Sequence, residues 1–139
     1  MRRLRDGSTK RVPVLEEESA KVEPWRQAVS GSFRARVGSA WVPLDGPVVL
    51  DVVFTVRRPT GAPKTRRVRP DRSPDLDKLL RATCDGLTEG GLWVDDGRLV
   101  AFRRLEELYA GDEDPDALTS SGAVIRAWLA PVTTIGGRS

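Results

Sequence analysis

The sequence predicts one α+β domain, a small mixed sheet with helices packed on one face. Two segments carry apolar residues at helical spacing, and three others are rich in β-branched and aromatic residues at strand length. Their order along the chain is helix, strand, helix, strand, strand, which is typical of an α+β arrangement. A chain of 139 residues can bury one hydrophobic core but not two, so we expect residues 1–139 to form a single domain.

The first predicted helix covers residues 19–30, where Val22, Trp25 and Val29 have i, i+3, i+7 spacing. Pro24 fits only in its first turn, because proline has no backbone N–H to donate inside a helix. One-sided spacing of this kind favours burial of the tryptophan over a role as a base-stacking platform.

Between this helix and the second predicted helix we expect a loop, a strand and a second loop. Residues 32–47 contain glycine and proline and predict a loop or a short edge element. Residues 48–56 alternate as a strand. Its apolar face comprises Val48, Leu50, Val52, Phe54 and Val56. The proline- and arginine-rich residues that follow, 57–74, predict a loop.

The second predicted helix opens at Ser73-Pro74, runs to about Leu87 and is ended by Gly90-Gly91. Its apolar stripe comprises Leu76, Leu79, Leu80 and Leu87. Strands are expected at residues 98–108 and 123–129, on either side of an acidic loop, before a frayed tail.

Composition excludes several kinds of chemistry. The chain has no histidine, so it lacks the usual general base, the usual zinc ligand and any Ser-His-Asp apparatus. Acid–base work must therefore fall to carboxylates, lysine or water activated by a metal ion. The single Cys84 excludes an internal disulfide, fits a reducing cytosol and is most simply a small buried residue.

The distribution of charge favours a protein that binds phosphates and also gathers carboxylates. Residues 1–72 contain 16 Lys and Arg against 8 Asp and Glu, whereas residues 73–139 contain 7 against 12. The alternative is an unevenly charged but merely solvated surface. No apolar run approaches the roughly 18 residues of a membrane span, and the basic N-terminus is not a signal peptide, so we expect a cytoplasmic protein without a membrane partner.

Residues 69–96 carry the strongest functional pattern. Asp75 and Asp77 open a helix, where both side chains can turn toward one point, and Asp96 arrives from the loop before the next strand. Three such carboxylates could hold one Mg²⁺, which would activate water against a phosphodiester. Taken singly, each motif has a simpler reading, since Asp-x-Asp is a common helix cap and Asp95-Asp96-Gly97 is a common turn.

The joint pattern resembles the signature of the RusA family of Holliday junction resolvases. That signature is an Asp-x-Asp, a helix with a basic residue that ends in Asp-Ala-Leu, and then Gly-x-x-x-Asp-Asp. The matching residues are Asp75, Asp77, Arg81, Asp85-Gly86-Leu87, Gly91 and Asp95-Asp96. The resemblance implies a homodimeric, Mg²⁺-dependent endonuclease that cuts four-way DNA junctions in recombination and repair, without a small-molecule organic cofactor.

Carried over by position, Asp75, Asp77 and Asp96 match the metal-binding aspartates, and Arg81 matches a lysine needed for cleavage. These four are the predicted catalytic residues. Asp95 matches the less critical partner of the final pair.

Three departures from the family pattern bear on this assignment. Lys78 replaces an asparagine, and Arg81 keeps the positive charge of the lysine but cannot readily donate a proton. Because Arg81 follows Asp77 by four residues, a simple ion pair is an equal alternative to phosphate binding. Thirdly, relatives begin with a strand and a basic, proline-rich segment, and this chain begins close to where that segment would end. Either the true start lies upstream or the sheet lacks an N-terminal edge strand.

DNA contacts are expected chiefly from the arginine-rich segment between the first strand and the second helix. The predicted contact residues are Arg57, Arg58, Lys64, Arg66, Arg67, Arg69, Arg72 and Lys78. A solvated run of charge is the alternative. Trp41 and Trp93 are candidates for packing before base stacking.

The function predicted is therefore resolution of four-way junctions by a structure-specific, Mg²⁺-dependent DNA endonuclease. Two alternatives stay open. One is a catalytically weak junction-binding protein, in which Lys78 and Arg81 fill the metal site with internal ion pairs. The other is the same nuclease centre acting on other branched DNA.

Overall fold

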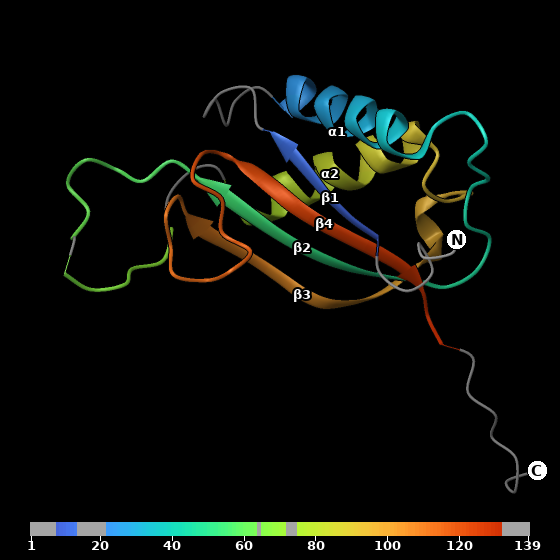
Figure 1. Ribbon diagram of the computed structural model, residues 1–139. Helices are drawn as coiled ribbons and strands as arrows, with labels where there is room; N and C mark the ends of the chain where they lie inside the picture. The colour runs from blue at the N-terminus through green and yellow to red at the C-terminus, as the bar shows by residue number, and fades with distance from the viewer. Residues whose placement is uncertain (1–7, 14–21, 64, 72–74, 132–139) are drawn as a thin grey trace, which may run out of the picture.

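The computed structural model describes residues 8–13, 22–63, 65–71 and 75–131. The elements are β1 (Ser8–Pro13), α1 (Val22–Val37), β2 (Val48–Val56), α2 (Leu76–Gly90), the 3₁₀ turn η2 (Asp96–Arg98), β3 (Leu99–Tyr109) and β4 (Gly122–Leu129). The strands form one mixed sheet in the order β1-β4-β2-β3, and both helices lie on the same face of it (Figure 1). The predicted α+β fold is confirmed.

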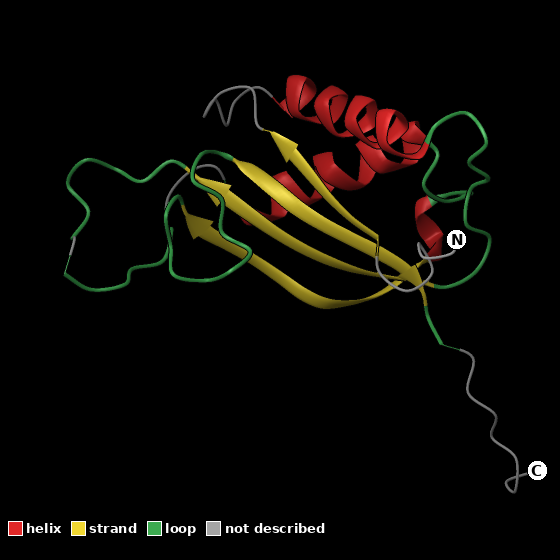
Figure 2. Cartoon of the chain, in the orientation of Figure 1, coloured by secondary structure: helices red, strands yellow, loops and turns green. Residues whose placement is uncertain are grey.

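The connection from β2 through α2 to β3 decides which loops meet. β2 and β3 are parallel, whereas β4 is antiparallel to β2 and β1 is antiparallel to β4. Parallel neighbours need a crossover, which α2 supplies, and their carboxyl ends lie at the same edge. Two loops therefore leave the sheet at one end (Figure 2). They are the arginine-rich loop, described at residues 57–63 and 65–71, and the acidic loop, residues 110–121.

The core lies between the helices and the sheet. Trp25 and Val29 of α1 are 5% and 0% exposed, which confirms their predicted burial. The indole N–H of Trp25 donates to Thr83 Oγ1 of α2 over 2.9 Å, and its ring meets Phe54 of β2 edge-on at a centroid distance of 6.4 Å. Trp25 thus contacts both the second helix and the sheet.

α1 runs two turns further than predicted. The residues that were expected to form a loop continue the helix to Val37, because Phe33 extends the apolar spacing and is buried against the end of α2. Gly31 lies within the helix and does not break it. The helix ends at Gly38, whose φ of 78° is the left-handed conformation that favours glycine and whose N–H donates to the Arg34 carbonyl.

α2 ends as predicted and begins within the described residues at Leu76. Gly91 caps its C-terminus with a φ of 91°. Leu87 of the predicted stripe is 1% exposed, and the stripe's other three leucines are partly buried. The predicted opening at Ser73-Pro74 lies outside the described residues. Gly86 is also buried, and this position was not part of the predicted stripe.

The three predicted strands are confirmed, since β2 matches residues 48–56 and the bounds of β3 and β4 shift by one residue or fewer at each end. The predicted apolar face of β2 packs under the helices. Its opposite face is buried as well, at Asp51, Val53 and Thr55. The acidic loop contributes to that burial, because the Leu118 N–H donates to Thr55 Oγ1 over 2.9 Å.

The sheet has an N-terminal edge strand that sequence analysis did not place. β1 pairs with β4 from Ser8 opposite Ala127 to Pro13 opposite Gly122. Of the two alternatives left open by the sequence, a sheet without an N-terminal edge strand is therefore wrong. This strand forms through long-range pairing with β4. Its segment, STKRVP, lacks the apolar alternation from which a strand is predicted in a sequence.

No helix in the described part of the chain has the length and apolar character needed to cross a membrane.

The two helices approach each other closely at Gly86. A Cβ added at this position would lie 2.6 Å from the carbonyl oxygen of Arg26 and 2.9 Å from the Cβ of Val29. Both neighbours are fixed parts of α1, so neither can move aside cheaply. This contact therefore fixes how closely α2 packs against α1.

We predict that Gly86→Ala destabilises the protein by about 1–3 kcal/mol, the usual cost of overpacking a core, despite the better helix propensity of alanine. The matched control is Gly31→Ala, because Gly31 is helical and exposed and a Cβ there meets nothing within 4 Å. That change should stabilise α1 by roughly 0.5–1 kcal/mol. Urea unfolding measures both, and equal stability of Gly86→Ala and the unsubstituted protein would contradict the close crossing.

Candidate functional site

Asp75 and Asp77 lie at the start of α2 and face solvent. Asp75 is the N-cap residue, with φ −73° and ψ 141°, yet its side chain makes no capping hydrogen bond and is 56% exposed. Asp77 is an exposed residue of the first turn. The capping explanation for this pair therefore fails for Asp75, whose carboxylate is left available for another partner.

The two basic residues near this turn are exposed on α2. Lys78 Nζ lies 4.0 Å from Asp75 Oδ2, at the outer limit of an ion pair, and the Lys78 side chain is 70% exposed. Both Asp77 and Arg81 belong to the described part of the chain, and they form no ion pair with each other. The i, i+4 pair that was the alternative for Arg81 is thus not formed here.

Asp95 and Asp96 have different surroundings. Asp95 Oδ1 accepts a hydrogen bond from the Gly97 N–H over 2.8 Å, and Asp95 Oδ2 lies 3.6 Å from Arg98 Nη1. Asp95 therefore forms the turn that the local sequence predicts. Asp96 begins η2 and is exposed. Its negative charge acts on Cys84 of α2, whose pKa rises to about 11 mainly because the thiol is buried and then because of Asp96 and Asp85.

The three aspartates predicted to bind a metal are not brought together into one group. In the described residues, no three or more acidic, cysteine or histidine side chains are close enough to hold one ion. The charge of Asp96 affects the pKa of the Cys84 thiol. Cys84 follows Asp77 by seven residues on α2, and seven residues span about 10 Å along a helix. Asp75 and Asp77 lie at the start of α2, whereas Asp96 follows the end of the helix, in η2.

Glu107 is a carboxylate near Asp75 that sequence analysis did not single out. It pairs with Phe54 across the parallel strands, and it shares the helix-covered face of β3 with Leu105. Its Oε2 atom is buried and has no hydrogen-bond partner. Burial, and then the negative charge of Asp75, raise the pKa of the Glu107 carboxyl to about 7. Strand alternation could have found it, as an acid at a core-facing position.

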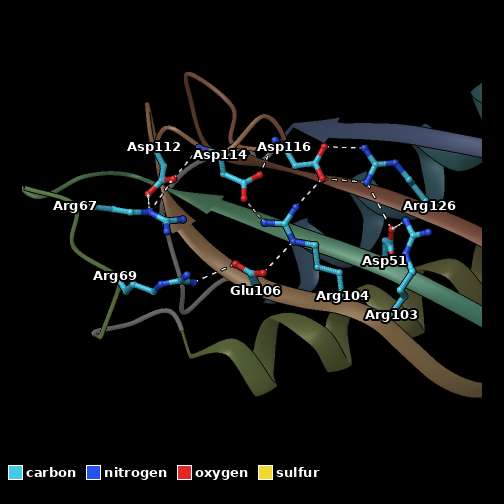
Figure 3. A network of polar contacts seen from close by, with 10 residues as sticks. All are labelled: Asp51, Arg67, Arg69, Arg103, Arg104, Glu106, Asp112, Asp114, Asp116 and Arg126. Atoms are coloured by element: carbon cyan, nitrogen blue, oxygen red, sulfur yellow. Dashed lines mark hydrogen bonds and ion pairs between the residues drawn. The ribbon is translucent and has the colours of Figure 1, made fainter.

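The opposite face of the sheet carries a network of ion pairs centred on Arg104 (Figure 3). The Arg104 guanidinium donates to Glu106 over 3.0 Å, to Asp116 over 2.9 Å and to Asp114. Arg126 donates to both oxygens of Asp116, over 2.7 and 3.0 Å. These hydrogen bonds hold the pKa values of the three carboxyls below their usual range.

A second arginine cluster neutralises Asp51 on the same face. This carboxylate is 1% exposed and accepts hydrogen bonds from Arg103, whose guanidinium also lies 4.9 Å from the ring centroid of Trp128. Arg126 Nη1 lies 3.7 Å from Asp51 Oδ2. The buried charge on β2 is therefore paired, as burial requires.

Two of the predicted DNA-binding arginines also hold the arginine-rich loop in place. Arg67 Nε lies 2.9 Å from Asp112 Oδ2, and Arg69 Nη1 lies 3.1 Å from Glu106 Oε1 (Figure 3). This anchoring role was not predicted.

The other members of the predicted set vary in their surroundings. Arg58 donates to the Pro63 carbonyl and lies 5.9 Å from the ring centroid of Tyr109. Arg57 has polar or electrostatic contacts of its own, and Arg66 is exposed. Lys64 and Arg72 lie outside the described residues.

Trp93 and Trp41 pack inside the molecule, as predicted. Trp93 is 1% exposed, and its indole N–H donates to Thr88 Oγ1 over 2.6 Å. Trp41 donates to the Gly91 carbonyl over 2.7 Å and meets Phe33 edge-on. Both rings fix the turn after α2 against its surroundings and leave Asp95-Asp96 on the surface beside it.

A family model described as Endodeoxyribonuclease RusA matches residues 7–114. The match spans β1 through β3 and includes every predicted metal-binding and DNA-binding position. No curated protein matches the chain.

We predict that Arg104→Met lowers the free energy of unfolding at pH 7 by about 1–2 kcal/mol, a discounted value for a partly buried ion-pair network. The three carboxyls bound to Arg104 or Arg126 have lowered pKa values in the folded state. Their stabilisation is therefore present above an unfolded carboxyl pKa of about 4 and is lost as the pH falls through the folded values.

The difference between Arg104→Met and the unsubstituted protein should accordingly shrink as the pH falls below about 4. Arg66→Met, at an exposed position of the arginine-rich loop, is the control and should change stability by less than about 0.5 kcal/mol. Denaturant unfolding across this pH range measures the effect. A difference that stays constant with pH would show that the Arg104 pairs do not stabilise the fold.

Proposed function

The chain belongs to the RusA endodeoxyribonuclease family, and from this membership we propose that it is a Mg²⁺-dependent endonuclease that resolves four-way DNA junctions in recombination and repair. The observation that carries the proposal is the uncapped, exposed carboxylate of Asp75, which opens α2 inside the family match. A carboxylate that forgoes its local hydrogen bond is suited to a ligand from outside the chain.

We assign the metal to Asp75, Asp77 and Asp96. Their carboxylates are the hard oxygen donors that Mg²⁺ prefers, and the buried, unpartnered oxygen of Glu107 near Asp75 fits a neighbouring cation. When bound, the ion would offset negative charge on the phosphate and lower the pKa of water. Because Asp96 lies apart from the pair in α2, we infer that residues 91–98 approach the start of α2 when the site is complete.

Arg81 and Lys78 are assigned to the scissile phosphate. Both are exposed on α2, within one turn of Asp77. Arg81 provides a fixed positive charge with several N–H donors, which suits phosphate binding, but a guanidinium does not readily give up a proton. The arginine's role is therefore to orient and neutralise the phosphate, and the proton for the leaving oxygen comes from solvent.

The arginine-rich loop is assigned to the DNA backbone. It projects beyond the end of the sheet at which α2 begins (Figure 1). Duplex bound there would continue past Asp75 and Asp77. Contacts of this kind give affinity with little sequence information, which suits an enzyme that recognises the shape of a junction.

One observation favours a second candidate function, junction binding with weak cleavage. Lys78 Nζ lies 4.0 Å from Asp75 Oδ2. If this contact shortened, the lysine ammonium would occupy the position that we assign to the metal ion. Sequence and charge also allow the same centre to act on flaps or other branched DNA.

The test of the proposed function is incubation with a labelled four-way junction, a flap and a linear duplex, each with Mg²⁺ and with EDTA. We expect cleavage with Mg²⁺ only, and fastest on the four-way junction. Binding without cleavage in every Mg²⁺ reaction would favour the junction-binding candidate, and faster cleavage of the flap would favour the other nuclease.

We predict that Asp77→Asn reduces cleavage at least about a hundredfold, the order of magnitude for removal of one charge-stabilising group from an active site. Junction binding, measured by gel shift, should be unchanged or tighter, because a negative charge has been removed and the shape of the side chain kept. Asp85→Asn, two turns further along α2, is the control and should cost less activity. An unimpaired Asp77→Asn protein would overturn the assignment of the metal site.

A homodimer is also part of the proposal. A four-way junction is cut on two opposed strands, whereas one chain carries one set of predicted aspartates, and a two-fold axis repeats the site. Three exposed valines support an interface near the points where β2 and β3 begin, with Val42 74%, Val94 50% and Val100 57% exposed. Val94 is tied to the loop that carries Val42, because its N–H donates to the Leu44 carbonyl.

We predict a dimer by light scattering, and linear product from a supercoiled cruciform plasmid because both strands are cut within one complex. The double variant Val42→Asp with Val100→Asp should be monomeric and should produce nicked circles. Thr119→Asp, an exposed position of the acidic loop, should leave the mass unchanged. A monomeric unsubstituted protein that only nicks would contradict the paired-site arrangement.

A further inference from the structure

We propose that Glu107 is a metal ligand that acts together with Asp75, so that the cation is held by β3 as well as by the start of α2. The inference rests on the proposed function, because it concerns the same metal site. It adds a donor that the sequence pattern did not contain.

The position of Glu107 in the sheet directs its carboxyl toward the helices. Glu107 lies opposite Phe54, a core residue of β2, and it follows Leu105, which packs against the same core, by two positions. Alternate residues of a strand share a face. The neighbouring Glu106 therefore points to the other face, where it binds Arg104 and Arg69.

The arginines of the network thus neutralise Glu106 and leave Glu107 on the side of α2. There the charge that acts on Glu107 is that of Asp75, which is also negative. The Oε2 atom of Glu107 is buried and has no hydrogen-bond partner. A buried carboxylate oxygen without a partner is costly, and a like charge nearby adds to the cost.

A divalent cation resolves both costs at once. It accepts oxygen donors from two carboxylates, and it replaces the repulsion between them with attraction to a shared charge. A pair of donors from two different elements also explains how a site can exist near Asp75 although the three predicted aspartates are not gathered in one place. Glu107 supplies the donor from the sheet, which the crossover through α2 holds beside the start of the helix.

The test is Glu107→Gln in the full-length protein, with thermal unfolding and calorimetric titration of Mg²⁺ and Mn²⁺. In metal-free buffer the variant should be as stable as the unsubstituted protein or more stable, because a buried charge near Asp75 has been removed. Its affinity for Mn²⁺ should fall about tenfold or more, and the stabilisation by metal should fall with it.

Glu106→Gln is the matched control, since it changes the adjacent residue on the opposite face. It loses hydrogen bonds to Arg104 and Arg69, so it should be less stable in metal-free buffer. Its metal affinity should be unchanged. The two neighbouring substitutions therefore give opposite patterns if Glu107 binds the cation.

An unchanged metal affinity in Glu107→Gln would overturn the inference and would mean that a proton or a water satisfies the buried oxygen. If that variant does not fold, Glu107→Asp keeps the charge and withdraws the carboxylate, and it should also bind Mn²⁺ more weakly; unchanged affinity would overturn the inference. Failure of the proposed function has a different signature, in which the unsubstituted protein binds metal but cleaves no DNA.

Discussion

The close packing of α2 against α1 at Gly86 constrains the helix whose first turn carries the predicted metal-binding pair. The crossing leaves no room for a Cβ, so α2 packs directly on the backbone of α1 at this point, and it connects the parallel strands β2 and β3. The start of the helix then lies beside the carboxyl end of β3, which brings Asp75 to Glu107. After α2 the chain returns to the sheet through η2. Asp96 lies in this turn, and its charge acts on Cys84, in the second half of the helix.

The carboxylates in the acidic second half of the chain fall into two groups, which differ in whether arginine side chains neutralise them. On the open face of the sheet, Arg104 and Arg126 neutralise the acidic loop, and Arg67 and Arg69 from the arginine-rich loop join them. Part of the uneven charge of the sequence is thus neutralised within the molecule, because arginines of the first half pair with carboxylates of the second half. On the helix-covered side, Asp75 has a long contact with Lys78, and Glu107 keeps a buried oxygen without a partner.

The sequence predicted the elements whose signals are local. The alternation in residues 48–56 and the left-handed Gly91 after α2 are such signals, and both were confirmed. β1 was missed because an edge strand depends on its pairing with β4, and the last turns of α1 were missed because they depend on burial of Phe33 by α2. The aspartates were identified from their motif, but their separation in space could not be read from the sequence, because it depends on how the turn after α2 packs.

Two departures from maximal stability coincide at the start of α2. An aspartate at an N-cap usually accepts a hydrogen bond worth about 0.5–2 kcal/mol, and Asp75 forgoes it. Beside it, Glu107 buries an oxygen that nothing in the described chain satisfies, although an apolar residue there would extend the core. One such feature could be incidental. Both features occur at the start of α2, where the charge of Asp75 acts on Glu107, and violations of local stability that coincide in this way are characteristic of a site shaped by its ligand.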